Sequence, residues 1–453
     1  MRILKTLNSI LVVKLTTAQS LLLGYLGFIF FGSILLMLPI SSAGDETLSL
    51  VDAIFTSASS ISGTGLIVVD TGGYFSLFGQ LVVLLLIQIG NVGYMLFFAL
   101  AVLFFGGRLS ILNKMIIKES ISHHSKLDFR VFIKKVFKYT LVIEGVSAVL
   151  LTIFFVQHFP PGEAIKQGIF HSISSFCTAG FSLFNNSLID FNDNYYFNFV
   201  IILTSYAGCI GFFVMYDISH FTKSLFVKKK RYKLSTHSKI VLFVSISISI
   251  FGMMFILLSE SVIGPGNEGG TFLKSFFQAT SASTTVGFSS VDIGKLNHSS
   301  QLYIILEMFI GASPSGTGGG IKTTVFALMV LSLITYFKDR RYVSVLKRTI
   351  PLVTITRAFS IVMLAVIWIF ISVMVLNLTE NKMFLNLLFE AASALGNGGM
   401  STGITPDLSS IGKLLLSASM LIGRVGPLIV GYTFLVKRRK ADYNYPDANI
   451  LIV

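Results

Sequence analysis

A short glycine-centred stretch that recurs four times along the chain is the feature that most constrains its fold. In each copy a Phe stands ten residues before the glycine, a Ser stands six residues before it, and an apolar residue follows it. The copies occupy residues 55–67, 170–182, 277–289 and 389–401, and their key glycines are Gly65, Gly180, Gly287 and Gly399. These glycines are 107 to 115 residues apart, close to a quarter of the 453-residue chain, so the spacing predicts four internal repeats.

The chain is too apolar for a soluble domain, with 53% hydrophobic and only 12% charged residues. Of its 35 Lys and Arg residues, 28 fall in short segments between or beside the apolar blocks: 1–17, 107–138, 223–239, 338–357 and 437–440. This distribution indicates the cytoplasmic face of a membrane protein and excludes nucleic acid as the explanation of the +14 net charge. The two cysteines, Cys177 and Cys209, are predicted to be unpaired.

Each repeat reads as an apolar span, a short helix, the glycine stretch and a second span. The short helices have about a dozen residues where roughly 20 are needed to cross a bilayer, so they are predicted to be re-entrant and covered by protein or by a water-filled cavity. First spans are expected at 17–38, 131–156, 239–258 and 355–378, short helices at 50–60, 163–176, 271–283 and 382–395, and second spans at 76–105, 195–226, 301–337 and 413–436.

With two crossings in each repeat, all four repeats start and end on the same side, which predicts parallel copies related by an axis along the membrane normal. The expected fold is an all-α integral membrane protein, with four repeats of outer helix, pore helix and inner helix in a pseudo-fourfold arrangement around a central pore. The repeats are expected at 1–116, 117–232, 233–345 and 346–440, followed by a cytoplasmic tail at 441–453.

The glycine stretches are the candidate ion site. Glycine can adopt positive φ, which lets consecutive carbonyls point to one side, and four such turns around an axis would replace the hydration shell of a cation, as in the filters of potassium channels. The candidate filter residues are Gly63, Thr64, Gly65, Thr178, Ala179, Gly180, Thr285, Val286, Gly287, Asn397, Gly398 and Gly399. The alternative is that the glycines are close-packing points between helices, but four copies in register favour the filter.

Polar residues stand five positions beyond three of the glycines, at Asp70, Asn185 and Asp292, whereas the fourth repeat has Ile404. Acidic groups at an outer mouth would raise the local cation concentration. Taken singly, each of the three polar residues is more consistent with an ordinary solvated loop.

Lys322 and Arg424 are charged residues within apolar spans, where a charge costs about 2.5–3.5 kcal/mol. We expect Arg424 to project into the conduction path below the filter and to repel a second cation. The alternative is a buried ion pair with an acid in another apolar segment, the candidates being Glu144, Glu307 and Glu390.

A proline and five glycines at 311–320 cannot continue a helix, so the second span of the third repeat is expected to be broken. We predict a flexible gate loop under the filter, with Lys322 anchoring its far side; a static kink is the alternative. The gate-loop residues are Gly311, Ala312, Ser313, Pro314, Ser315, Gly316, Thr317, Gly318, Gly319 and Gly320.

On these four stretches, on residues 311–322 and on Arg424, the chain resembles the Trk/Ktr/HKT superfamily of cation transporters over essentially its whole length. Within it the chain is most similar to the KtrB type, because no extra helical pair precedes the first repeat. Where the family more often has a Thr-Val-like pair this chain has Asn397-Gly398, which leaves the strictness of K⁺ over Na⁺ selection open.

The resemblance implies K⁺ uptake across a bacterial cell membrane, with K⁺ bound only by the filter backbone and both termini in the cytoplasm. It also implies a homodimer and a cytoplasmic KtrA-type ring that binds nucleotide. No Gly-rich phosphate loop follows a strand in this chain, so nucleotide control would come from that partner. No cofactor is expected in the chain itself, and Na⁺ as an activator stays open.

Two other classes of function are alternatives to this one. A Na⁺- or H⁺-coupled symporter is the alternative to a channel-like subunit, although the sequence lacks a series of membrane acids along one path. An intramembrane enzyme is not expected, because neither a metal-binding His pair nor a Ser/Lys or paired-Asp constellation occurs at one depth.

Overall fold

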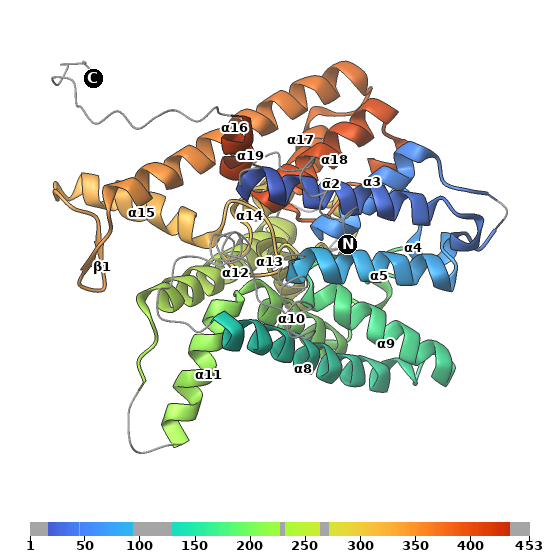
Figure 1. Cartoon of the computed structure of the whole chain (residues 1–453), viewed down its shortest axis with the longest axis horizontal. Helices are drawn as coiled ribbons and strands as arrows, with labels where there is room; N and C mark the ends of the chain where they lie inside the picture. The colour runs from blue at the N-terminus through green and yellow to red at the C-terminus, as the bar shows by residue number, and fades with distance from the viewer. Residues whose placement is uncertain (1–16, 45, 94–128, 227–231, 263–270, 435–453) are drawn as a thin grey trace, which may run out of the picture.

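The computed structural model describes residues 17–44, 46–93, 129–226, 232–262 and 271–434 (Figure 1). Most of the basic segments 1–17 and 107–138, the end of the span expected at 76–105, and the tail at 441–453 lie outside these residues. The described chain is almost entirely helical, with one two-stranded hairpin, β1 (Ser344–Val345) paired antiparallel with β2 (Arg348–Thr349).

Four long apolar helices correspond to the four expected first spans, and each is long enough to cross a bilayer. They are α2 (Thr17–Leu36), α8 (Phe129–Phe155), α12 (Thr236–Val262) and α16 (Leu352–Thr379). Less than a third of the apolar window of each helix is buried within the protein, so most of this surface is available to lipid.

A helix of only 13 to 16 residues follows and packs against each long helix, as the repeat pattern predicts. The four are α3 (Leu50–Ser62), α9 (Pro161–Phe176), α13 (Phe272–Thr284) and α17 (Phe384–Gly396). Local capping explains where two of them begin: the Ser49 hydroxyl accepts from the Asp52 amide, and the Thr271 hydroxyl accepts from the Lys274 amide. The Phe that opens each glycine stretch lies on these helices and is at most 1% exposed.

The next helices close the arrangement into a ring. They are α5 (Leu77–Val92), α10 (Tyr195–Cys209), α14 (His298–Ile310) and α18 (Ser410–Val425). Each of them packs against the short helix of the following group: α5 against α9, α10 against α13, and α14 against α17. The last helix, α18, returns to the first group and packs against α3, so the four groups follow one another around the molecule (Figure 1).

Two of the expected continuous second spans are wrong. In the span expected at 195–226, α10 is followed by α11 (Phe212–Phe226) with a bend of 103°, because Gly211 between them has φ of +91° and leaves the helical region. In the span expected at 413–436, α18 ends at Val425 and α19 (Pro427–Phe434) follows after Gly426, whose φ is +99°. The break expected at 311–320 is present and separates α14 from α15 (Thr323–Phe337).

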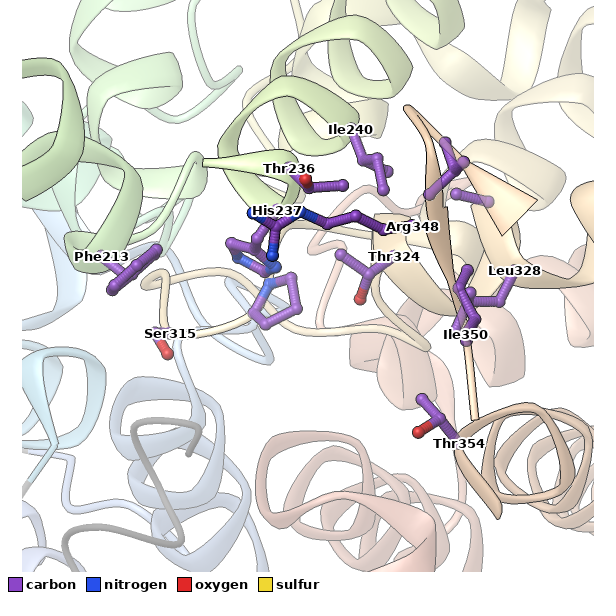
Figure 2. Close-up of a pocket in the computed structure, with 13 residues that line it drawn as sticks. Phe213, Thr236, His237, Ile240, Ser315, Thr324, Leu328, Arg348, Ile350 and Thr354 are labelled. Carbon is purple, nitrogen blue, oxygen red and sulfur yellow. The ribbon is translucent and has the colours of Figure 1, made fainter. Parts of the chain in front are cut away.

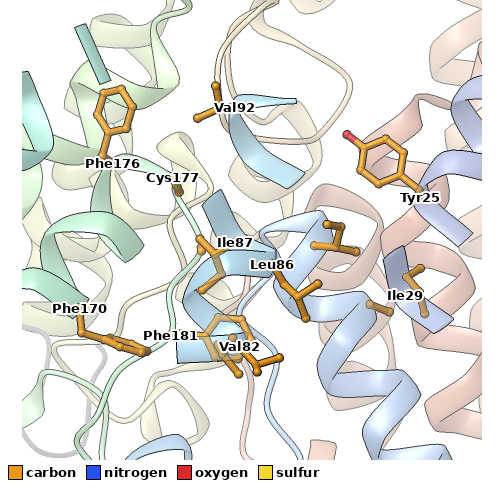
Figure 3. Close-up of a cluster of buried hydrophobic side chains, with 14 of the residues drawn as sticks. Tyr25, Ile29, Val82, Leu86, Ile87, Val92, Phe170, Phe176, Cys177 and Phe181 are labelled. Carbon is orange, nitrogen blue, oxygen red and sulfur yellow. The ribbon is translucent and has the colours of Figure 1, made fainter. Parts of the chain in front are cut away.

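Short elements follow the glycine stretches and shape the surface beyond them. They are the one-turn helix α4 (Thr71–Tyr74) and the 3-10 turns η2 (Ile189–Phe191), η3 (Ile293–Lys295) and η4 (Thr405–Asp407); a further turn, η1 (Pro39–Ser41), follows α2. A hydrophobic cluster joins α2, α5 and α9, with Tyr25, Leu86 and Phe170 among its members (Figure 3). Cys177 belongs to this cluster, and both it and Cys209 are buried and unpaired, as predicted.

Candidate functional site

All four glycine stretches adopt the same strained turn. The residue two positions before each key glycine is left-handed, with φ of +66° at Gly63, +50° at Thr178, +57° at Thr285 and +50° at Asn397. Positive φ is unusual for a β-branched residue and persists only where the surroundings hold it, which is common at ligand sites. The key glycine two residues later is also left-handed in every copy, with φ between +64° and +93°.

The four key glycines meet one another, each one facing a backbone carbonyl of the next stretch. The partners are Gly65 with the Ala179 carbonyl, Gly180 with that of Val286, Gly287 with that of Gly398, and Gly399 with that of Thr64. A Cβ at any of these glycines would lie less than 3.0 Å from the carbonyl oxygen that it faces. The glycines are therefore required by space as well as by φ, and the contacts run once around the ring and close.

The Ser six residues before each glycine holds the turn to its own helix. Its carbonyl accepts from the amide of the middle residue of the turn in all four copies, at 2.8 to 3.1 Å. Its hydroxyl differs between copies: Ser174 and Ser281 donate to the carbonyl directly after the glycine, whereas Ser59 accepts from the Gly65 amide. The Ser393 hydroxyl is buried without a partner.

The residue directly after the Phe that opens each glycine stretch also supports the turn, and the sequence did not predict this role. It is polar in every copy, and in three of them its side chain reaches the segment that follows the glycine. His171 Nε2 lies 3.1 Å from Ser182 Oγ, Gln278 Oε1 accepts from the Ser290 amide, and Glu390 accepts from the Thr405 hydroxyl. A polar residue inside a buried apolar helix was the signal that could have revealed this role.

Asn397, where the chain departs from its family pattern, keeps the common backbone geometry. Its side-chain amide donates to Thr64 Oγ1 at 2.8 Å and to the Met420 carbonyl at 2.9 Å. The amide thereby joins the fourth turn to the first turn and to α18. Its Oδ1 atom is buried without a donor.

The predicted outer-mouth residues line one cavity together with the four glycines. The cavity has a volume of about 450 Å³, and Asp70, Asn185 and Asp292 are all on its wall. Both aspartates also cap local turns: Asp70 accepts from the Gly72 and Gly73 amides, and Asp292 accepts from the Gly294 amide. Lys295 lies 3.5 Å from Asp292 and offsets part of its charge. Ile404 is instead buried in a hydrophobic cluster.

The loop at 311–320 lies directly against two of the glycine turns. The Gly319 amide donates to Thr285 Oγ1 at 3.1 Å, and Thr317 Oγ1 lies 3.2 Å from Thr178 Oγ1. The space at Gly318 and Gly319 is filled by neighbouring residues, because a Cβ there would clash with Thr285 and Asn397. The loop therefore contacts the second filter turn through Thr317 and the third through Gly319.

The same loop is tied to the break between α10 and α11. The Ser313 and Thr317 amides donate to the Cys209 and Gly208 carbonyls at 3.1 and 3.2 Å. In return the Phe212 amide donates to the Ser315 carbonyl at 3.0 Å. The bend at Gly211, which was not predicted, therefore supplies the free backbone groups that hold the loop in position.

Both charges predicted within the spans contact this loop. Lys322 Nζ donates to the Gly318 and Gly319 carbonyls at 2.7 and 3.3 Å. Arg424 donates to the Thr317 carbonyl through Nη1, and through Nη2 to the Gly90 and Asn91 carbonyls at the end of α5, both at 2.9 Å. Arg424 therefore joins α18, α5 and the loop through carbonyls.

Among the residues that the structure describes, Arg424 forms no ion pair with Glu144, Glu307 or Glu390. Glu144 accepts from the Gln88 side chain at 3.1 Å, and Glu390 supports the turn after Gly399. Glu307 is 1% exposed, with no hydrogen-bond partner at either oxygen. Within the described part of the chain, no group of three or more His, Cys, Asp or Glu side chains could hold a metal ion.

The sequence profile of the TrkH family, described as cation transport protein, matches residues 32–444. The chain belongs to this family. Its membership confirms the resemblance drawn from the sequence and makes the chain a multi-pass membrane transporter rather than an enzyme.

Relatives of this TrkH-family chain match it over nearly its whole length. It is 33% identical to the Ktr system potassium uptake protein B of Bacillus subtilis over 444 residues, which is 97% of each chain. It is 32% identical to the potassium/sodium uptake protein NtpJ of Enterococcus hirae, covering 97% of this chain and 98% of the relative. The crystal structure of the potassium transporter TrkH from Vibrio parahaemolyticus has the same fold, with a TM-score of 0.71 at 20% identity, over 91% of this chain and 84% of the other.

Proposed function

We propose that the chain is the K⁺-translocating subunit of an uptake system, and that the ring of glycine turns is its selectivity filter. The proposal is based on four glycines that are more than a hundred residues apart in the sequence. Each faces a carbonyl of another's turn, and all four line one cavity. Backbone carbonyls in such a ring replace the water that a dehydrating K⁺ ion loses, with no side-chain ligand required.

In this proposal the fold works as four repeats of outer helix, pore helix and inner helix around one path. The short helices α3, α9, α13 and α17 are the pore helices, and their buried Phe and Ser residues orient the filter turns. The cavity lined by Asp70, Asn185 and Asp292 is the outer mouth, where the two carboxylates attract cations.

The loop at 311–320 is the proposed gate. Its contacts with the Thr178 and Thr285 hydroxyls leave it against the filter on the way to the other side of the membrane. Lys322 and Arg424 hold it there through its carbonyls. For the gate to open, the loop would have to move away from the filter and these contacts would have to break. The guanidinium of Arg424 would then also be free to move.

The relatives supply the expected setting. Three relatives are named as components of Ktr systems, which supports a further component of such a system as partner of this chain. The proposal gives that partner the form of a cytoplasmic, nucleotide-binding KtrA-type ring, and takes this chain to be a homodimer in a bacterial cell membrane. The basic segments 1–17 and 437–440 of the sequence favour a cytoplasmic location for both termini, which is part of this proposal.

A rescue assay tests the proposal. Expression in a host that lacks its own K⁺ uptake should restore growth at low K⁺ and allow ⁸⁶Rb⁺ uptake, and Gly287→Asp, which places a side chain against the Gly398 carbonyl, should abolish both with normal membrane insertion. Wild-type-like uptake by that variant would contradict the filter assignment.

A Na⁺-coupled or Na⁺-stimulated symporter is the second candidate, favoured by the name of the Enterococcus hirae relative, potassium/sodium uptake protein. Uptake of ⁸⁶Rb⁺ into proteoliposomes with and without a Na⁺ gradient separates the two. A strict need for the gradient would establish Na⁺ coupling, and uptake without Na⁺ would exclude it.

A further inference from the structure

A second cavity, of about 350 Å³, adjoins the gate loop (Figure 2). Pro314 and Ser315 form one part of its wall, whereas Thr317 and Gly319 of the same loop contact the filter turns. The rest of the wall comes from the beginnings of α11, α12 and α16, from α15, and from the hairpin of β1 and β2. A volume of this size is within the range of small-molecule sites.

The lining is amphipathic. Aliphatic side chains such as Ile240, Leu328 and Ile350 make most of it, and the basic groups His237 and Arg348 stand among them (Figure 2). Arg348 is exposed, and no ion pair joins it to a carboxylate among the residues that the structure describes. An occupant that fits this wall has an apolar chain and an anionic group.

The surroundings of the hairpin match the surface of a membrane. The segment 338–357 has six Lys and Arg residues and one Asp. Exposed aromatic side chains precede the hairpin at Tyr336, Phe337 and Tyr342, with exposed fractions of 81%, 81% and 60%. Aromatic and basic residues of this kind mark the level of lipid headgroups, and basic pockets between membrane helices bind anionic headgroups.

We propose that this cavity is a binding site for an anionic phospholipid, with its phosphate at Arg348 and an acyl chain along the aliphatic wall. The choice of a lipid follows from the open, amphipathic cavity beside a basic and aromatic surface. A free anion would leave the aliphatic wall uncovered, and an uncharged lipid would not engage Arg348.

Occupancy of the cavity acts on the gate loop. The Ser315 carbonyl accepts from the Phe212 amide, so the loop closes the cavity only while it is held against α11. If the loop moves, Pro314 and Ser315 leave the wall and the lipid loses those contacts. A ligand shifts an equilibrium toward the state that it binds better, so the lipid favours the loop in its position against the filter and lowers ion flux. This step depends on the proposed function.

Lipid binding is tested on the purified full-length chain by native mass spectrometry, with phosphatidylglycerol and phosphatidylcholine of the same acyl chains as probes. The wild type should retain phosphatidylglycerol in preference. Arg348→Gln should lower this retention about fivefold, since one basic residue near an anionic surface contributes about 1 kcal/mol. Arg341→Gln is the matched control, because Arg341 lies in the same basic segment, over the Tyr342 ring, and does not line the cavity. Equal retention by the two variants would overturn the site.

The effect on the gate is measured as ⁸⁶Rb⁺ uptake into vesicles of phosphatidylcholine alone or mixed with phosphatidylglycerol. Wild type and Arg341→Gln should be slower in the mixture, and Arg348→Gln should be equally fast in both. If the wild type takes up ⁸⁶Rb⁺ equally fast in both kinds of vesicle, the proposed effect of the lipid on the loop is wrong. Absence of uptake by every variant in every vesicle would contradict the transport function and leave the binding result to stand by itself.

Discussion

The hydroxyl of Ser281 offers an internally controlled test of how the filter turns are held. It donates to the Phe288 carbonyl at 2.6 Å, and both residues are at most 2% exposed. Ser281→Ala removes the donor and leaves the carbonyl in a site that water does not reach. The equivalent residue of the fourth repeat, Ser393, is equally buried, but its hydroxyl has no partner.

The two alanine variants differ in expected magnitude because only one of them breaks a bond. Leaving a buried carbonyl unsatisfied costs about 1–3 kcal/mol, so Ser281→Ala should destabilise the turn by that amount. Ser393→Ala removes an unsatisfied hydroxyl and should be neutral or slightly stabilising. A loss of 1 kcal/mol raises the share of misaligned turns about fivefold.

The assay is the ratio of K⁺ to Na⁺ flux in proteoliposomes, with thermal unfolding of the same preparations in detergent. Ser281→Ala should lower the flux ratio at least severalfold and lower the unfolding temperature, while Ser393→Ala should keep both near the wild-type values. The reasoning is refuted if the two variants behave alike, or if Ser393→Ala is the more damaging one.

Three further predictions concern the ring and the gate loop. Gly180→Ala should abolish ⁸⁶Rb⁺ uptake, because the residue has a φ of +64° and its Cβ would clash with the Val286 carbonyl of the next repeat. Gly27→Ala is the control and should transport normally, because nothing lies within 4 Å of a Cβ there. Equal uptake by the two variants would contradict the proposed ring of glycine turns. Arg424→Gln should raise uptake about tenfold, since a hydrogen bond from a charged donor contributes about 1.5–3 kcal/mol to holding the loop. If uptake is unchanged and thermal stability is lowered, the role of Arg424 is structural alone. Deletion of residues 312–318 should give a leaky transporter, and complete loss of uptake with normal insertion would argue against a gate.

The contact between the four glycine turns could be anticipated from the sequence because it depends on a constraint that is visible there. A turn with positive φ and no room for a Cβ admits only glycine, so Gly65 and its three equivalents stand in register with the Phe and Ser that support them. The long helices were equally predictable, since a bilayer demands about 20 apolar residues in a row.

The breaks at Gly211 and Gly426 could not be predicted in the same way. Single glycines are frequent in membrane helices and are usually helical, so neither one distinguishes a bend from a close helix contact. What opens the helix at Gly211 is its neighbour in space, since the Pro314 carbonyl occupies the position that a Cβ would take and the Phe212 amide bonds to Ser315. Those partners are about a hundred residues away in the sequence.

The partners of the charged residues were also beyond the sequence. An arginine within an apolar span suggests a carboxylate partner, and three glutamates were available. Arg424 instead donates to the carbonyls of Thr317, Gly90 and Asn91. These carbonyls are free because α5 ends and the loop begins there, which depends on how the helices pack. Side-chain identity alone does not report on free backbone acceptors.

Because α18 returns to α3 and completes the circle within a single polypeptide, the four quarters of the wall are encoded separately. In a pore assembled from four identical chains, any substitution appears at four places at once. Here the fourth group carries both Arg424 and Asn397, and the third group carries the non-helical loop at 311–320. A single chain can therefore change one group at a time, so a substitution in one group leaves the equivalent positions of the other three unchanged.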